Sequence, residues 1–204
     1  VGPGLWAEPL NLLSNGAFFL AGFYLLAKRP AVGDTRWVQL LIGLIFLIGT
    51  GSALFHSFAN VLTELADVIP IGIFVMLYLF VLIREVLFWS WPQTCGLAFV
   101  FGFLLYGSWL IPSAWVNGSN LYIAILALLC ILGFFVRSLP GHRLFLGCVL
   151  IFACSLTIRS FDQAVCDMWP VGVHYFWHIL NSLLLASLVV YLRLNLSPSS
   201  KALS

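Results

Sequence analysis

Two histidines lie one helical turn apart in the apolar stretch "GVHYFWHILN" (172–181). At this spacing on a helix, the imidazoles of His174 and His178 share one face. Ionisable side chains are costly inside a lipid bilayer, and those found there usually serve a function. This pair is therefore the first candidate for chemistry in the chain.

Two further stretches carry polar side chains near the ends of apolar segments. In "GTGSALFHSF" (49–58), Ser52 and His56 are four residues apart and share a helical face. In "TELADVIP" (63–70), Asp67 is followed closely by a proline. The order of the apolar segments predicts that these side chains and the histidine pair lie at one depth, near the same membrane face.

These residue types, brought together, would suit a catalytic zinc site. Such sites typically have three protein ligands and one open position, and we expect His56, His174 and His178 to be the ligands. Zinc lowers the pKa of a bound water to about 7, and Asp67 could move its proton as general base and then acid. Ser52 could donate a hydrogen bond to a carbonyl oxygen on which negative charge develops.

Other interpretations of the same residues stay open. Membrane histidines also hydrogen-bond across helices for packing alone, and axial histidines on membrane helices hold haem iron. Ser52 is as well suited to close helix packing as to catalysis. Glu8, on the first apolar segment, is expected at the depth of the metal, where it could bind a second cation or support a ligand.

Residues around this layer give three further expectations. Trp177 directly precedes His178 and points to a different side of the helix. Tyr122, at the start of another apolar segment, could reach the layer. Arg159 and Asp162 are three residues apart, which predicts an ion pair.

The composition is that of an integral membrane protein. Of the 204 residues, 62% are hydrophobic and 8% are charged, whereas soluble domains are about one quarter charged. A net charge of +2 argues against nucleic acid as a partner. Both lysines lie outside the apolar segments, which excludes a retinal Schiff base within the bundle.

Seven segments approach the roughly 20 apolar residues that a spanning helix needs. They are residues 8–27, 36–57, 62–83, 95–111, 120–137, 143–159 and 172–192. Neither a linker nor a low-complexity region separates them, apart from a short polar tail. We therefore expect an all-α, seven-transmembrane helix bundle that forms a single domain over residues 1–204.

Basic residues in the connections predict the orientation of this bundle. Cytoplasmic loops carry an excess of lysine and arginine. One side of the predicted topology carries eight basic residues: Lys28, Arg29, Arg36, Arg84, Arg137, Arg143, Arg193 and Lys201. The other side carries Arg159. We therefore expect the N-terminus outside, the C-terminus in the cytoplasm and the polar layer near the non-cytoplasmic face.

The motifs resemble a known family. The stretch "SALFH" (52–56), an aspartate eleven residues after its histidine, and "HYFWH" (174–178) resemble the alkaline ceramidases. These belong to a superfamily of seven-helix hydrolases that includes the adiponectin receptors. The stretch "EPLNLLSN" (8–15) looks like that family's "E-x-x-N-x-x-S-N" on the first helix. The resemblance covers nearly the whole chain.

The resemblance implies a zinc-dependent amidase in a lipid bilayer, which hydrolyses ceramide-like lipids to a long-chain base and a fatty acid. Carried over by position, it assigns the metal, proton-transfer and oxyanion roles to the same five residues as the chemistry above. It adds Trp177 and Tyr122 as residues that line the substrate amide. No protein partner is implied.

The resemblance is incomplete for calcium, and two relatives suggest other functions. Eukaryotic members hold calcium in an acidic, Trp-containing N-terminal segment and on a first-helix glutamate. Here only Trp6 and Glu8 are similar, so we do not count calcium among the expected cofactors. A lipid ester would pass through the same tetrahedral oxyanion as an amide. A receptor with a structural zinc is disfavoured, because the short loops leave little surface for a protein ligand.

Overall fold

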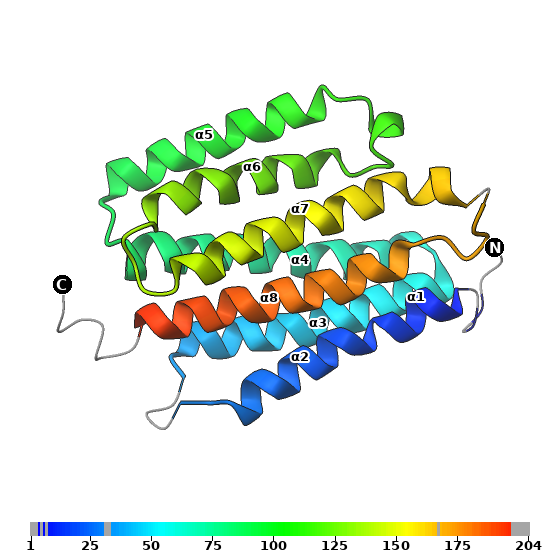
Figure 1. The fold of residues 1–204 in the computed structure, drawn as a ribbon, viewed down its shortest axis with the longest axis horizontal. Coiled ribbons are helices and arrows are strands. Elements are labelled where there is room, and N and C mark those ends of the chain that lie inside the picture. The colour runs from blue at the N-terminus through cyan, green and yellow to red at the C-terminus, as the bar shows by residue number, and fades with distance from the viewer. Residues whose placement is uncertain (1–3, 5, 7, 31–33, 167, 197–204) are drawn as a thin grey trace.

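The computed structural model describes residues 4, 6, 8–30, 34–166 and 168–196, and these residues form helices without any strand (Figure 1). The α-helices are α1 (Pro9–Ser14), α2 (Gly16–Ala27), α3 (Arg36–Phe58), α4 (Val61–Val81), α5 (Trp91–Trp109), α6 (Asn120–Phe135), α7 (His142–Val165) and α8 (His174–Leu196). A π-helical turn (Leu82–Val86) continues α4, and a 3-10 turn (Ser113–Trp115) follows α5. Lys201, one of the basic residues used for the orientation, lies outside the described residues.

Each of the seven segments expected from the sequence contains helix. The first is divided at Asn15 into α1 and α2. Five helical segments are long and apolar enough to cross a membrane: Pro9–Ala27, Arg36–Phe58, Val61–Val86, His142–Val165 and His174–Leu196. The other two differ from these, since α6 is apolar but has 16 residues, and α5 begins with the polar run "WPQT". The all-helical class is thus confirmed, together with five candidate spans.

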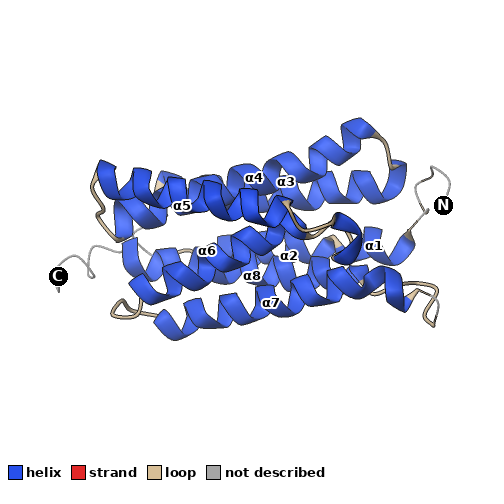
Figure 2. Ribbon diagram, turned by 90° about the horizontal axis from the view of Figure 1, so that it is seen from above, coloured by secondary structure: helices blue, strands red, loops and turns tan. Residues whose placement is uncertain are grey.

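The helices form a bundle in which α8 lies between α7 and the pair α2 and α3 (Figures 1 and 2). The most extensive helix–helix contact joins α3 and α4, which are connected by a short turn and pack along each other. On the other side, α6 joins α7, and α5 lies against α6 at the edge of the bundle. Because α1 packs against α3 and α8, one end of the bundle collects α1, the end of α3 and the starts of α4 and α8.

Large apolar side chains cover the outside of the bundle. Leu20, Phe99, Phe103 and Leu150 are each between 67% and 79% exposed, and they come from three different helices, α2, α5 and α7. Soluble monomers rarely expose contiguous apolar surface on this scale. Together with the candidate spans, this surface indicates an integral membrane protein whose outer side chains face lipid.

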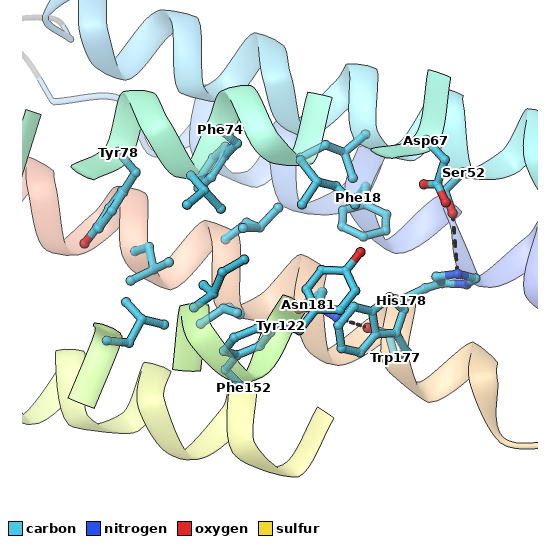
Figure 3. Close-up of a pocket in the computed structure, with 18 of the residues that line it drawn as sticks. Phe18, Ser52, Asp67, Phe74, Tyr78, Tyr122, Phe152, Trp177, His178 and Asn181 are labelled. Atoms are coloured by element: carbon cyan, nitrogen blue, oxygen red, sulfur yellow. Dashed lines mark hydrogen bonds between the residues drawn. The ribbon is translucent and has the colours of Figure 1, made fainter. Parts of the chain in front are cut away.

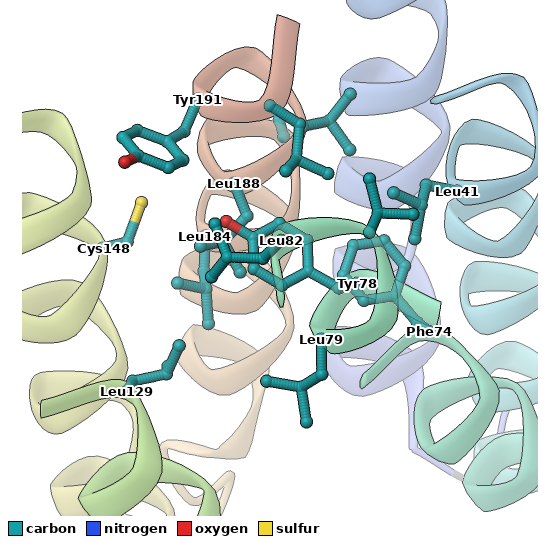
Figure 4. Close-up of a cluster of buried hydrophobic side chains, with 14 of the residues drawn as sticks. Leu41, Phe74, Tyr78, Leu79, Leu82, Leu129, Cys148, Leu184, Leu188 and Tyr191 are labelled. Carbon is teal, nitrogen blue, oxygen red and sulfur yellow. The ribbon is translucent and has the colours of Figure 1, made fainter. Parts of the chain in front are cut away.

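Between the helices, the interior is closely packed away from the polar end. Buried side chains of α3, α4, the π-helical turn after α4, and α8 pack together there (Figure 4). They include Leu41, Phe74, Leu82, Leu188 and Tyr191. This packing fixes the depth of α8 relative to α3 and α4.

A closely packed glycine brings α3 and α4 together near the polar end. A Cβ atom on Gly51 would lie 1.9 Å from the backbone oxygen of Ala66. That oxygen has no amide partner one turn later, because residue 70 is a proline inside α4. The two helices therefore touch backbone to backbone at the residues that directly precede Ser52 and Asp67.

Candidate metal centre and cavity

Three histidines meet at the end of the bundle where α1 lies. His56 comes from the last turn of α3, while His174 begins α8 and His178 follows one turn later. The ring centroids are 4.8 Å apart for His56 and His178, 4.9 Å for His174 and His178, and 5.3 Å for His56 and His174. One nitrogen from each ring lies within 4.8 Å of the other two. The expected clustering of the three imidazoles is therefore present.

The turn between α3 and α4 holds one side of this site. Ala59 ends α3 in the left-handed conformation, with φ of 43°. Asn60 then caps α4, since its side-chain oxygen accepts the backbone N–H groups of Leu62 (3.0 Å) and Thr63 (3.1 Å). This tight reversal places the start of α4 beside the end of α3, which carries His56.

Ser52 and Asp67 lie beside His178 (Figure 3). The close contact at Gly51 brings these two side chains next to each other. The Ser52 hydroxyl is also 3.4 Å from Nε2 of His178, a long contact. Ser52 and Asp67, which the order of the apolar segments predicts at the depth of the histidines, thus lie together at the edge of the histidine cluster.

The opposite edges of two imidazoles contact the first helical segment. Oε2 of Glu8 lies 2.6 Å from Nδ1 of His56. The Ser14 hydroxyl lies 2.7 Å from Nδ1 of His178. The hydrogen bond with His56 is the main cause that lowers the pKa of Glu8 to about 2, so this side chain is a carboxylate. Glu8 therefore reaches the site through a ligand candidate.

An apolar cavity begins beside these polar side chains (Figure 3). Ser52, Asp67 and His178 line its polar end, and Tyr78 and Leu188 line its far end. Along α8, the distance from His178 to Leu188 corresponds to about 15 Å of helix. The lining suits a hydrocarbon chain whose polar end reaches the histidines.

The aromatic residues expected near the layer line this cavity. Tyr122 of α6 and Trp177 of α8 are in edge-to-face contact, with ring centroids 5.0 Å apart. Both rings form part of the cavity wall beside the polar end. They are placed to contact a group bound between Ser52 and His178.

The ion pair expected between Arg159 and Asp162 is wrong. Asp162 instead accepts the backbone N–H of Val173 at 2.6 Å, which fixes the chain just before α8. The Arg159 guanidinium lies over the rings of Trp177 (5.0 Å) and Tyr122 (5.4 Å). Sequence spacing could not show this contact, because it joins three helices.

The nitrogen atoms of the three histidines can be compared with the ligand geometry of a zinc site. Zinc–nitrogen bonds of about 2.0–2.1 Å in a tetrahedron separate two ligand nitrogens by roughly 3.3 Å. Nε2 of His56 and Nε2 of His178 are 3.2 Å apart. Neutral imidazoles are normal zinc ligands, and His174 offers a third nitrogen beside them. The three residues fit a zinc ion, and Asp67 and Ser52 lie next to the position it would take.

Fold and site together define an all-helical membrane protein with a buried cluster of three histidines at the mouth of an apolar cavity. No protein-family model, no curated protein and no solved structure matched this chain when it was compared with them. The evidence for a function is therefore the geometry of the chain's own residues and the motifs that resemble alkaline ceramidases.

Proposed function

We propose that the protein is a membrane-embedded zinc hydrolase that cleaves the amide bond of a ceramide-like lipid to a long-chain base and a fatty acid. The observation that carries this proposal is the position of the histidine cluster. His56, His174 and His178 converge beside Ser52 and Asp67, where the apolar cavity begins. A metal, a proton carrier and a hydrocarbon site would thus meet at one point.

Zinc, when bound by the three histidines, would supply Lewis acidity for polarising a carbonyl and activating a water. Asp67 would take a proton from the attacking water and pass it to the leaving amine, so that it acts first as base and then as acid. The Ser52 hydroxyl would donate a hydrogen bond to the carbonyl oxygen as negative charge develops there. The water oxygen ends in the fatty acid and the proton on the amine.

The cavity supports a lipid as substrate. Its wall is almost entirely apolar; Ser52, Asp67 and His178 line the histidine end, and the Tyr78 hydroxyl lies at the far end. A hydrocarbon chain in the cavity would hold the adjoining amide beside Ser52, with Trp177 and Tyr122 against it. A two-chained lipid would enter sideways from the bilayer, which supplies it already dissolved in hydrocarbon.

For the membrane topology, we propose seven spans with the N-terminus outside and the active site near the non-cytoplasmic face. The five apolar segments, together with α5 and α6, make seven helical segments that alternate in direction along the bundle. The eight-to-one distribution of basic residues supports the orientation.

The other interpretations differ in how well they suit the site. A lipid ester would use the same side chains, and only substrate comparison separates it from an amide. A structural zinc in a receptor would not need Ser52 and Asp67 beside the metal and at the mouth of a cavity. Axial haem ligands stand on opposite faces of a porphyrin, whereas three imidazoles cluster here with ring centroids 4.8 to 5.3 Å apart.

The test is metal analysis and hydrolysis on the detergent-purified protein. We expect about one zinc per chain and release of fatty acid from an N-acylated long-chain base, with an O-acyl analogue run in parallel. His178→Ala should lose both zinc and hydrolysis. His142→Ala, which changes a histidine outside the cluster, is the matched control and should keep both. Hydrolysis retained by His178→Ala would overturn the proposal.

A further inference from the structure

Residues of the short helix α1 and of its N-cap contact two of the three metal-site histidines, on the ring edge that faces away from the cluster. Glu8, directly before α1, contacts Nδ1 of His56 at 2.6 Å. Ser14, the last residue of α1, contacts Nδ1 of His178 at 2.7 Å. In both rings it is the same nitrogen, and in both it points away from the centre of the cluster.

The direction of each hydrogen bond follows from the partner. A carboxylate has no proton to give, so Glu8 accepts the proton of His56 Nδ1. The single proton of the Ser14 hydroxyl is donated to the backbone oxygen of Asn11 at 2.9 Å. Ser14 therefore accepts from Nδ1 of His178. Both imidazoles then carry their proton on Nδ1.

This assignment leaves two bare nitrogens face to face. Nε2 of His56 and Nε2 of His178 are 3.2 Å apart, and in these tautomers neither has a proton to share. Two lone pairs at this distance repel each other unless a cation lies between them. The arrangement imposed from α1 is thus the one in which both rings present Nε2 to a metal.

Asn11 joins the two contacts into one network. Its side-chain amide donates to the same Glu8 oxygen that faces His56, at 2.8 Å. Its backbone oxygen accepts from Ser14. Glu8, Asn11 and Ser14 are spaced three residues apart, so they follow one face of the α1 segment. That face lies against α3 and α8, the helices that carry the histidines.

We propose that α1 is the positioning element of the metal site: Glu8 and Ser14 fix His56 and His178 as the tautomers that bind metal through Nε2, and thereby set the affinity for the ion. This inference rests on the zinc site of the proposed function and extends it to residues that touch no metal or substrate. Outer partners of this kind typically change metal affinity by about 10- to 100-fold.

The experiment measures zinc affinity by competition with a chromophoric chelator in the full-length, detergent-purified protein. Glu8→Ala and Ser14→Ala should each weaken zinc binding by about 10- to 100-fold. Glu8→Gln and Ser14→Thr keep an acceptor oxygen, and they should recover most of the affinity. The visible spectrum of the cobalt-substituted protein should change in the alanine variants and return toward the parent in the conservative ones.

A matched control separates positioning from general loosening of the fold. The Ser182 hydroxyl, one turn after His178 on α8, donates to the backbone oxygen of Ile179 in its own helix at 2.8 Å. Ser182→Ala removes a buried hydroxyl from the same region, and it should keep parental zinc affinity. Equal losses in Ser182→Ala and Ser14→Ala would overturn the positioning role.

The outcomes distinguish this inference from the proposed function. Parental zinc affinity in both Glu8→Ala and Ser14→Ala would overturn the inference and leave the zinc hydrolase standing. Weakened zinc binding in these variants, with no lipid hydrolysis by the parent protein, would support the role of α1 and overturn the proposed function. A parent that binds no zinc would overturn both.

Discussion

Among the single residues of the site, Asp67 is the one whose substitution should lower turnover without changing the zinc content. Its carboxyl group lies beside Ser52 and His178, and Asp67 is not among the three residues placed to bind the metal. Asp67→Asn keeps the shape but removes the ability to take up a proton. Turnover should therefore fall by about 100-fold or more while zinc content stays at the parental level.

The control for Asp67 is the neighbouring acid on the same helix. Glu64 lies three residues earlier on α4 and is exposed. Steady-state hydrolysis and metal analysis of Glu64→Gln should match the parent protein. If Asp67→Asn turned over lipid as fast as Glu64→Gln, proton transfer would have to be assigned to another group.

The candidate site was partly predictable from the sequence, because residue type and helical spacing determine which side chains share a face. His174 and His178 belong to one helix, so their proximity follows from the four-residue spacing alone. The contacts of Ser14 and Arg159 join different helices, and their partners depend on how those helices rotate against each other. The stretch "EPLNLLSN" contained Ser14, but its spacing does not indicate which histidine it meets.

At the scale of helices, the contact at Gly51 determines where Asp67 sits. Gly51→Ala would place a Cβ atom against the backbone oxygen of Ala66, so α4 has to move away from α3. Overpacking of this kind costs about 1–3 kcal/mol of stability, and a displacement of about 1 Å at a catalytic group can lower turnover by about 100-fold. Both the melting temperature and hydrolysis should fall.

Gly43 provides the matched substitution on the same helix. Its added Cβ would meet no atom within 4 Å, so Gly43→Ala should leave thermal unfolding in detergent and hydrolysis close to the parental values. A Gly51→Ala protein as stable and as active as Gly43→Ala would mean that α3 and α4 can separate without disturbing the site.

Helix ranges followed from hydropathy where a segment was uniformly apolar, as in α3, whose expected range 36–57 nearly matches Arg36–Phe58. The sequence was less informative where polar and apolar residues alternate. Asn15 divides the first segment, and its side-chain amide donates to the backbone oxygen of Asn11 at 2.8 Å. Hydropathy does not record such local competition for backbone groups.

At the scale of the whole molecule, the bundle is held by different interactions at its two ends. One end has the histidine cluster and its hydrogen bonds to α1. At the other end, Arg193 of α8 forms a two-pronged ion pair with Asp34, at 2.8 Å and 2.7 Å. The guanidinium also donates to the backbone oxygen of Leu25 at 2.8 Å, which ties α8 to the end of α2.

This second end should contribute to stability without contributing to chemistry. The Asp34 side chain is 2% exposed and that of Arg193 is 10% exposed, and removing one partner of a buried pair typically costs about 3–5 kcal/mol. Asp34→Ala or Arg193→Ala should lower the melting temperature in detergent while the folded fraction keeps parental zinc affinity. The double variant should lose less than the sum of the two single losses, since neither charge is then left buried alone.

Arg143→Ala, at an exposed arginine at the start of α7, should not shift unfolding. Additive losses in the double variant would show that the two side chains stabilise the bundle separately, and altered zinc affinity would show that the two ends are coupled through α8.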